Sequence, residues 1–434
     1  MTSTKTLYVY LTQTIPQLEQ VLVGALSKHT QGSLTFCYDT TYLASPSAKP
    51  LSQSLPLQAA PFDHVLTEAY FSGLLPDEWV RKRVARYLNI SVQNTFGLLE
   101  ALGGECAGAV ALSSEPFGVS VPSTYKATYQ PLTDEEAAAL FATLEKRPLL
   151  AGEEGVRMSG AGAQDKLMVL LLPDHRLAIP KYQTPSSHLL KPNIRDLQDT
   201  VHNEYFCMRL AHQVGLPTPP VMIRWVQGVP YYLVERYDRQ VLAMPSSELP
   251  HLQRLHQEDF CQALRIAPQY KYENEGGPTL TQCFALLEHL IAQGWMLGRE
   301  KLHFFQKVLF NFMIGNGDAH GKNFSLLYHE GIQLAPTYDV LCTLVYGNAY
   351  KAKMAMKLGD EYHFKRITMR HILRFGASIG LKPKYIEKQT SVLLQRVLTE
   401  APKLVETLQA SEHTASPLYT DILTIIYQQA QQLQ

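Results

Sequence analysis

The chain is organised around one stretch, FFQKVLFNFMIGNGDAHGKNFSLLYHEGIQLAPTYD, which covers residues 304–339. In its first third, apolar residues recur at steps of one, three and four positions, and this spacing predicts a helix that is buried along one face. The residues on that face are Phe304, Phe305, Val308, Leu309, Phe312 and Met313. We expect the helix to end at Gly315 and to act as a platform for the polar residues that follow.

Three side chains with oxygen atoms follow this predicted helix. Asp318 lies in a loop of small residues, and Asn323 comes five positions later. Two short apolar runs, at 324–328 and 331–335, predict a strand hairpin that turns the chain back. We therefore expect Asp339, which follows the hairpin, to lie at the same end as the other two side chains.

This order of side chains is typical of a phosphoryl-transfer site. One carboxylate accepts the proton of an attacking hydroxyl, while an amide oxygen and a second carboxylate hold Mg²⁺ on the phosphates of ATP. The spacing of Asp318 and Asn323 is that of a kinase catalytic loop. An ordinary solvent-exposed loop can carry such a pair, and the addition of Asp339 after a hairpin is what favours the catalytic interpretation.

Composition excludes several other classes. The 434 residues predict two or three domains. Because 39 Lys and Arg balance 39 Asp and Glu, the whole molecule has no net field that would attract nucleic acid or a membrane. The six cysteines form no C-x-x-C pair, and no stretch reaches the length of a membrane span. We expect a soluble cytoplasmic protein with reduced thiols and no membrane contact.

The order of the elements predicts an α+β fold with a two-lobe, protein-kinase-like core. Residues 1–148 are expected to form a small α+β N-terminal module, because short β-branched runs precede a more helical part. Residues 149–240 are strand-rich and predict the N-lobe. Residues 241–434 are mostly helical through to the C-terminus and predict a C-lobe that carries the catalytic loop.

Three features of the predicted N-lobe suit a nucleotide. A loop of small residues at 159–163 precedes an apolar strand and can lie over phosphates, although an ordinary hairpin turn has the same composition. It is not a P-loop, because Ala161 stands where the lysine is required. Lys191 ends a short apolar strand and either neutralises phosphates or reaches solvent. A third strand, at 231–235, runs out into charged residues where a kinase has its adenine-binding hinge.

A basic segment at 351–388 contains ten basic residues against three acidic ones. Arg366, Arg370 and Arg374 recur every four positions and are expected to share one helix face. In an otherwise neutral chain, this segment is where DNA or an acidic partner would bind. A solvated basic face is the alternative.

Eight stretches spread over nearly the whole chain resemble the HipA family, the toxin kinases of bacterial toxin–antitoxin pairs. They are LAS and PLSQSLP (43–45 and 50–56), GLLPD (73–77), SGAGAQDK (159–166), NEYFCMRLA (203–211), VERYDR (234–239), HQEDFCQAL (256–264), GNGDAHGKNFS (315–325) and PTYD (336–339). Taken together these motifs are highly specific, although each alone is weak.

The resemblance implies a Ser/Thr protein kinase that uses ATP and Mg²⁺. It implies a protein substrate of the aminoacyl-tRNA synthetase class, slowed growth, and restraint by a DNA-binding antitoxin dimer of the HipB type, with operator DNA bound through the complex. It also implies that Ser159 is a site of autophosphorylation.

Roles are carried over position by position. Asp318 is the implied base, and Asn323 and Asp339 are the implied metal ligands. The implied ATP-binding residues are Ala161, Gly162, Ala163, Gln164, Asp165, Lys166, Lys191, Glu235, Arg236, Tyr237, His320, Gly321, Lys322, Asn323, Tyr338 and Asp339. In one departure, Ala-His-Gly follows Asp318 where relatives often have Gly-His-Ala, which changes loop flexibility but keeps every polar group.

Two other functions are open on this evidence. A small-molecule kinase of the aminoglycoside-phosphotransferase type also has an Asp followed five residues later by Asn, but such enzymes lack the N-terminal module. A catalytically dead co-repressor bound to DNA is the other alternative. Against it stands the intact set of Lys191, Asp318, Asn323 and Asp339.

Overall fold

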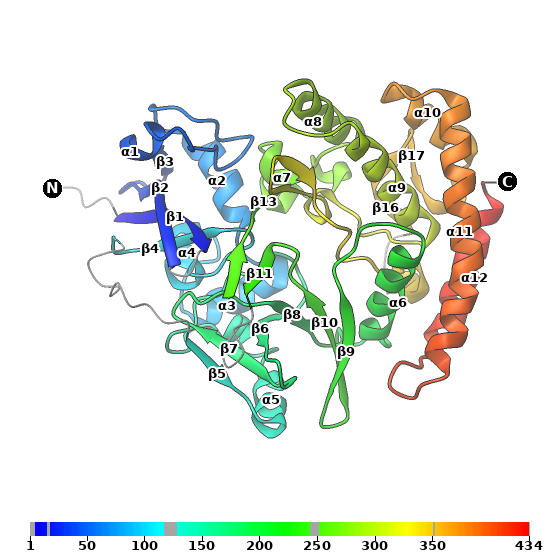
Figure 1. Ribbon diagram of the computed structural model, residues 1–434, viewed down its shortest axis with the longest axis horizontal. Coiled ribbons are helices and arrows are strands. Elements are labelled where there is room, and N and C mark those ends of the chain that lie inside the picture. The colour runs from blue at the N-terminus through cyan, green and yellow to red at the C-terminus, as the bar shows by residue number, and fades with distance from the viewer. Residues whose placement is uncertain (1–4, 15–17, 117–127, 244–250, 350–351, 434) are drawn as a thin grey trace. The chain divides into compact units, whose positions relative to one another are not determined.

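A computed structural model describes residues 5–14, 18–116, 128–243, 251–349 and 352–433, and these residues form helices and several sheets (Figure 1). The chain divides into two compact units, each made of segments distant in sequence. The first comprises Met1–Lys191, Glu235–Gln269 and Leu327–His329, and the second Pro192–Val234, Tyr270–Leu326 and Glu330–Gln434. The division into a module and two lobes at residues 148 and 240 stays a prediction.

The first unit begins with an antiparallel sheet in the order β3-β2-β1-β4 (Figure 1). Its strands are β1 (Lys5–Thr14), β2 (Leu18–Lys28), β3 (Leu34–Tyr38) and β4 (Val110–Ser113). Alternate residues face the core, as the pleat of a strand requires, and Leu7, Val9 and Phe36 are fully buried. Four helices follow β3: α1 (Thr40–Leu43), α2 (His64–Gly73), α3 (Glu78–Tyr87) and α4 (Thr95–Leu102). The side chains of Asp39, Asp63 and Asn94 cap three of these helices by accepting backbone N–H groups.

In a second sheet, the strands that belong to the first unit run in the order β5-β7-β6-β8. They are β5 (Thr128–Pro131), β6 (Leu167–Leu171), β7 (Leu177–Lys181) and β8 (His188–Lys191), and α5 (Asp134–Phe141) follows β5. The predicted strand that ends in Lys191 is therefore present as β8. The unit is completed by β11 (Arg239–Ala243), β12 (His251–Arg254), β13 (His256–Asp259) and α7 (Phe260–Ala263).

Glu258 on β13 joins this last segment to the N-terminal part of the first unit. Its carboxylate accepts hydrogen bonds from the Ser52 hydroxyl, the Gln53 backbone N–H and the Tyr328 hydroxyl. Burial raises the pKa of Glu258 to about 7, although these hydrogen bonds act in the opposite direction. The carboxyl group therefore titrates near neutral pH.

The second unit begins with α6 (Thr200–Gln213) and a hairpin of β9 (Val221–Val226) and β10 (Val229–Glu235). Gln227 and Gly228 connect the two strands, and both have positive φ angles, of 46° and 78°. A two-residue turn of this kind matches the twist of an antiparallel pair. The predicted strand at 231–235 is thus the second strand of a hairpin.

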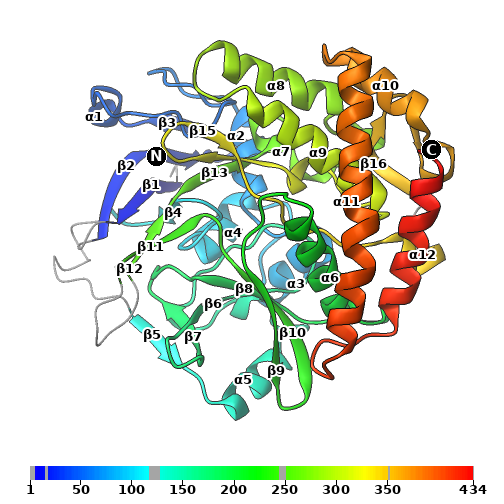
Figure 2. The same ribbon diagram turned by 45° about the vertical axis from the view of Figure 1, so that its right-hand side comes forward.

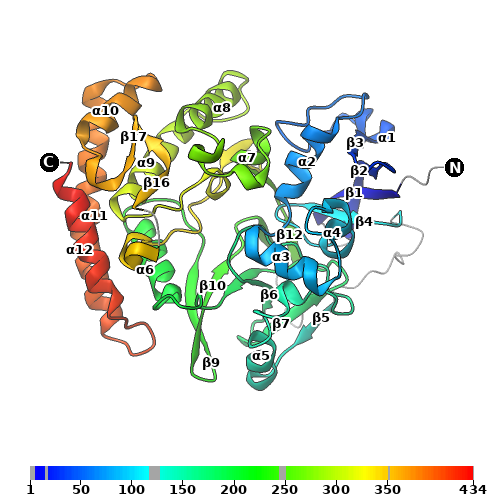
Figure 3. The ribbon, with the colours of Figure 1, turned by 180° about the vertical axis from the view of Figure 1, so that it is seen from behind.

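Helices dominate the rest of the second unit (Figures 2 and 3). They are α8 (Leu280–Ala292), α9 (Arg299–Met313), α10 (Met369–Ser378), α11 (Pro383–Gln409) and α12 (Leu418–Gln431). In Figure 2 the long helix α11 lies beside α12, and the two helices pack along each other. The short strands β14 (Ser325–Tyr328) and β15 (Ile332–Leu334) follow α9 at the predicted positions.

Two of the structural predictions for the second unit were wrong. Helix α9 is not buried along one face alone, because every residue from 304 to 313 except Gln306 is buried, as in a helix at the centre of a large core. The segment before α10 is not helical throughout, because β16 (Lys353–Leu358) and β17 (Glu361–His363) form a hairpin there (Figure 3). Arg366 belongs to a short 3₁₀ turn, so it does not share a helix face with Arg370 and Arg374.

All six cysteines carry free thiols, and five of them are buried. Across the described ranges, every helix is too short or too polar to cross a lipid bilayer.

Candidate active site

The end of α9 sets the position of the predicted catalytic loop. Gly315 follows the helix with a φ of 74°, a conformation that ends helices and that favours glycine. Asn316 is buried beyond it, and its side chain donates to the Asn311 side chain at 2.7 Å and accepts the Asp318 backbone N–H at 3.0 Å. The Gly317 N–H donates to the Thr343 hydroxyl at 2.7 Å. The loop is therefore fixed to a rigid helix at its first residues.

Asp318 is partly buried, and its carboxylate accepts a hydrogen bond from the hydroxyl of Tyr272. Tyr272 lies 46 residues earlier in the chain, just before a short 3₁₀ turn at Glu273–Glu275. Strand β16 fixes this 3₁₀ turn, because the Lys357 backbone N–H donates to the Glu273 carboxylate at 2.6 Å. Tyr272 thus fixes the direction of the carboxylate that the sequence predicts as the base.

His320 is buried next to Tyr272, and the two rings meet edge to face at 5.1 Å between centroids. Burial lowers the pKa of His320 well below its usual value, and the charge of Lys271 lowers it further. The imidazole is therefore neutral at physiological pH. Its Nδ1 atom is buried and has no hydrogen-bond partner in another residue of the described ranges.

The two predicted metal ligands lie next to each other. The Asn323 side-chain nitrogen donates to the Asp339 carboxylate at 3.3 Å. Asp339 itself has a φ of 55°, a left-handed conformation that costs free energy in a residue with a β-carbon and that is found at functional sites. Tyr338 supports this arrangement, since its hydroxyl donates to the backbone oxygen of Lys322 at 2.8 Å.

These side chains fit Mg²⁺ bound together with nucleotide phosphates. Mg²⁺ is commonly held by one or two protein oxygen ligands together with phosphates and water, and Asn323 and Asp339 supply an amide and a carboxylate. Among the described residues there is no cluster of three or more His, Cys, Asp or Glu that would form a cage for a metal on its own. The donor set therefore favours a metal that arrives with a ligand.

The remaining predicted site residues belong to the first unit. In the small-residue loop, Gly162 has a φ of 107°, which favours glycine, and its carbonyl accepts the Asp77 backbone N–H at 3.1 Å. The ammonium group of Lys166, which is buried, donates to the carbonyl of Ala161. Asp165 forms a two-pronged ion pair with Arg83, at 2.6 and 3.0 Å. Ala163 is exposed and Gln164 is half-buried.

Ser159 is the first residue of this loop and is fully buried. Its hydroxyl donates to the Leu74 carbonyl at 2.5 Å, and its backbone N–H donates to the Glu105 carbonyl at 2.8 Å. Both partners belong to the N-terminal part of the first unit. In this conformation the hydroxyl is therefore closed off from solvent.

Lys191 at the end of β8 is also buried, with 5% of its surface exposed. The predicted hinge residues differ from one another in their surroundings. Glu235 is half-buried, and burial raises its pKa. The Tyr237 hydroxyl donates to the Gln257 side chain. Arg236 points its side chain into a buried network of charged groups rather than to the surface. Its backbone is also engaged, because its N–H donates to the Ser187 carbonyl at 2.9 Å and its carbonyl accepts the Arg239 N–H at 3.0 Å.

The predicted residues thus fall into two groups, one in each unit. In the second unit, Asp318, His320, Asn323 and Asp339 come together around one loop with Gly321, Lys322 and Tyr338. In the first unit, residues 159–166, 191 and 235–237 stand on connected elements. Sequence reasoning missed Tyr272, Asn316 and Thr343, which orient the loop. Tyr272 and Thr343 lie far from Asp318 in the sequence, and Asn316 belongs to no recognised motif, so no sequence pattern indicated them.

The basic segment is partly neutralised by its own acids. Arg374 contacts Asp360, and Arg366 lies 3.9 Å from the Glu361 carboxylate. Six other basic residues of the segment are exposed, namely Lys353, Lys365, Arg370, Lys382, Lys384 and Lys388. Lys351, the first basic residue of the segment, lies outside the described residues.

Comparisons with known proteins agree with the sequence resemblance. The family model for the HipA N-terminal domain matches residues 17–113, and that for the HipA-like C-terminal domain matches residues 158–403. A protein of Sinorhizobium fredii named putative kinase Y4mE is 41% identical over 352 residues, which is 80% of each chain. The serine/threonine-protein kinase toxin HipA of Shewanella oneidensis is 28% identical over 388 residues, which is 88% of this chain and 86% of the relative.

The fold also matches a solved structure. The HipA chain in the complex of HipA, HipB and operator DNA from Shewanella oneidensis superposes with a TM-score of 0.80 at 24% identity, covering 98% of this chain and 97% of the other. The expected α+β fold of the protein-kinase-like class is therefore confirmed. The chain belongs to the HipA family of Ser/Thr kinase toxins.

Proposed function

We propose that this chain is an ATP-dependent protein Ser/Thr kinase that acts as the toxin of a toxin–antitoxin pair. The observation that carries the proposal is the arrangement in the second unit. There Asp318 is oriented by Tyr272, and Asn323 lies beside Asp339. Membership of the HipA family supports the same reaction. We further propose that the substrate is a translation protein of the aminoacyl-tRNA synthetase class, in line with the sequence resemblance.

In the proposed reaction, a Ser or Thr hydroxyl oxygen forms a bond to the γ-phosphorus of ATP while the bond from that phosphorus to the leaving ADP oxygen breaks. Asp318 takes the hydroxyl proton. Asn323 and Asp339 would hold Mg²⁺, which would neutralise charge on the phosphates. Lys166 and Lys191 would add positive charge at the phosphates, and His320 stays neutral.

The first prediction tests Asp318 as the base. Asp318→Gln replaces the carboxylate with a neutral amide that cannot accept the proton, so the rate of transfer should fall about 10²-fold or more while ATP still binds. Autophosphorylation with labelled ATP measures the rate, and labelling of a lysate from the native host identifies the substrate. The variant should also lose the growth arrest that expression of the wild type causes. A variant that retains more than about a tenth of the wild-type rate would exclude Asp318 from this role.

The second prediction concerns Tyr272 as a positioning residue. Tyr272→Phe removes the hydroxyl that orients Asp318, and a hydrogen bond to a charged group contributes about 1.5–3 kcal/mol. The value of kcat should therefore fall about tenfold or more, whereas the KM for ATP should stay within about twofold. Tyr270→Phe provides a matched control, because this exposed tyrosine lies two positions away. An unchanged kcat in the Tyr272 variant would contradict the role.

The third prediction is that the kinase phosphorylates its own Ser159 and that this lowers its affinity for ATP. A phosphate adds about −1.5 to −2 charges, and the fully buried position beside the Leu74 carbonyl cannot hold them, so the segment must leave its place. The loop that follows would then lose its fixed position over the nucleotide. We expect the Kd for ATP to rise about tenfold or more in the phosphorylated form.

Mass spectrometry of the wild type, with Asp318→Gln as the control, tests the first half of this prediction. ATP titration of the two separated forms tests the second half. A wild-type protein without phosphate on Ser159 contradicts the first half, and equal ATP affinities contradict the second.

We also propose that a HipB-type antitoxin dimer binds this chain and that operator DNA is bound through the complex. The solved complex of the Shewanella oneidensis relative with HipB and operator DNA supports this. The overall charge of zero supports it as well, because tight binding to DNA requires many cations at the phosphates and the acids of this chain balance its bases.

The fourth prediction follows from this charge balance. In a mobility-shift titration over a salt series, the chain alone should bind operator DNA weakly and without sequence preference, and tight specific binding should appear when the antitoxin is added. Tight specific binding by the chain alone would overturn the proposal. A complex that binds DNA while the purified chain transfers no phosphate would instead favour the co-repressor alternative.

A further inference from the structure

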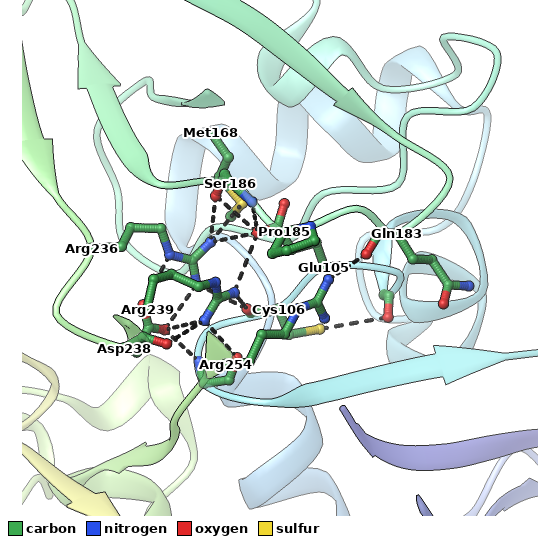
Figure 4. Close-up of polar contacts among 12 residues, drawn as sticks. Glu105, Cys106, Met168, Gln183, Pro185, Ser186, Arg236, Asp238, Arg239 and Arg254 are labelled. Carbon is green, nitrogen blue, oxygen red and sulfur yellow. Dashed lines mark hydrogen bonds and ion pairs between the residues drawn. The ribbon is translucent and has the colours of Figure 1, made fainter. Parts of the chain in front are cut away.

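The first unit contains a buried cluster of charged side chains that the proposed reaction does not use (Figure 4). Two carboxylates, Glu105 and Asp238, stand among three arginines, Arg236, Arg239 and Arg254, and each of the five is at least 94% buried. Figure 4 shows Arg236 and Arg239 directed toward both carboxylates. Buried charges require this degree of pairing, since an unpaired one is costly.

The charges come from separate parts of the chain. Glu105 belongs to the N-terminal part of the first unit, whereas Arg236 and Arg239 follow the predicted hinge strand. Arg236 donates to one Glu105 oxygen at 3.1 Å and Arg239 donates to the same oxygen at 3.3 Å. Asp238 in turn accepts the backbone N–H of Gly108 at 2.6 Å. The short segment from Glu105 to Gly108 is therefore bonded to Arg236, Asp238 and Arg239, which are part of the predicted hinge or follow it.

Glu105 also contacts two further predicted nucleotide-binding segments. Its carboxylate accepts the backbone N–H of Ser186 at 2.7 Å and the Ser186 hydroxyl at 2.8 Å, just before β8 and Lys191. Its backbone pairs with the segment before the small-residue loop: the Glu105 N–H donates to the Arg157 carbonyl at 2.8 Å, and its carbonyl accepts the Ser159 N–H at 2.8 Å. Glu105 thus contacts the predicted hinge, the residue before β8 and the small-residue loop.

The charge state of Glu105 fits this role. Burial alone would raise the pKa of Glu105, but the charges of Arg236, Arg239 and Arg254 outweigh burial and lower it. The carboxylate is therefore ionised at neutral pH and accepts hydrogen bonds from all its donors at once. A neutral side chain of the same shape would leave two buried guanidinium groups without a full counter-charge.

We infer that Glu105 is a positioning residue for ATP. It fixes the position of the predicted hinge relative to the small-residue loop, and it lies outside the predicted kinase lobes. This inference rests on the proposed kinase function. It assigns the N-terminal part of the first unit a direct part in nucleotide affinity. The side chain itself acts through Arg236, Arg239 and Ser186 and does not touch the nucleotide.

The test is the affinity of the full-length chain for Mg–ATP after Glu105→Gln, measured by calorimetry near pH 7. The substitution keeps the shape and an acceptor oxygen but removes the charge that holds both arginines. We expect the Kd to rise about tenfold or more. In kinetics, the KM for ATP should rise by a similar factor while kcat changes less. A merely structural role would instead lower the active fraction, which scales kcat and leaves KM unchanged.

Glu258→Gln is the matched control. Glu258 is also a buried glutamate that joins the N-terminal part of the first unit to a later segment, but its carboxylate contacts Ser52, Gln53 and Tyr328 and no predicted nucleotide-binding residue. Because burial raises its pKa to about 7, glutamine resembles a form that the wild type already populates. Its Kd for ATP should stay within about twofold of the wild-type value.

The outcomes separate the two claims. A wild type that binds no ATP overturns the proposed function and the inference with it. A wild type that binds ATP, with an equal Kd in Glu105→Gln or an equal loss in both variants, overturns the inference alone. If Glu105→Gln does not fold, Ser186→Ala decides, because it removes one hydroxyl from the network without removing a charge. That variant should weaken ATP binding a few-fold, and an unchanged Kd overturns the inference.

Discussion

The burial of Glu105 and Asp238 among three arginines is the interaction on which the first unit depends. Burying an ion pair costs several kcal/mol per ion, and the pairing offsets this cost when the geometry is good and other hydrogen bonds are made. Removing one partner of a buried pair typically costs about 3–5 kcal/mol. The segments that supply these charges can therefore move only as one body, although they lie about 130 residues apart in the chain.

In the second unit, the predicted catalytic loop starts from neutral hydrogen bonds at the end of a rigid helix. The second half of α9 is buried on nearly every side, so the end of the helix is rigid. The loop that carries Asp318 starts from this rigid end. Asn316 and Thr343 then determine the first turn of the loop. The left-handed backbone of Asp339 costs free energy that this surrounding structure must supply, and the residue is also one of the two oxygen donors suited to Mg²⁺.

The features of this structure that were predicted from the sequence are those that depend on residues close together in the chain. The end of α9 at a glycine, the loop with Asp318 and Asn323, and the short hairpin all follow from local spacing. The one-sided burial expected for α9 was wrong, because a stripe shows which residues face inward but not how many layers cover the helix. Arg236 shows a similar limit. Its motif was found, but the direction of its side chain depends on Glu105, which no pattern links to it.

The loop that carries Ser159 is held by weaker interactions than the hinge, and this difference decides which of the two can move. Ser159 and Gly162 attach it to the N-terminal part of the first unit by neutral hydrogen bonds, each worth about 0.5–1.5 kcal/mol net. The ion pair of Arg83 with Asp165 is partly exposed, and exposed pairs typically contribute about 0.2–1 kcal/mol, with more expected for a two-pronged pair such as this one. Opening the loop therefore costs only a few kcal/mol, within the range of local unfolding, and it leaves the ion pairs of Glu105 and Asp238 with the arginines in place. We therefore expect that the predicted nucleotide-binding loop can open while the predicted hinge stays in place, since the backbone of Glu105 holds the former and its carboxylate holds the latter.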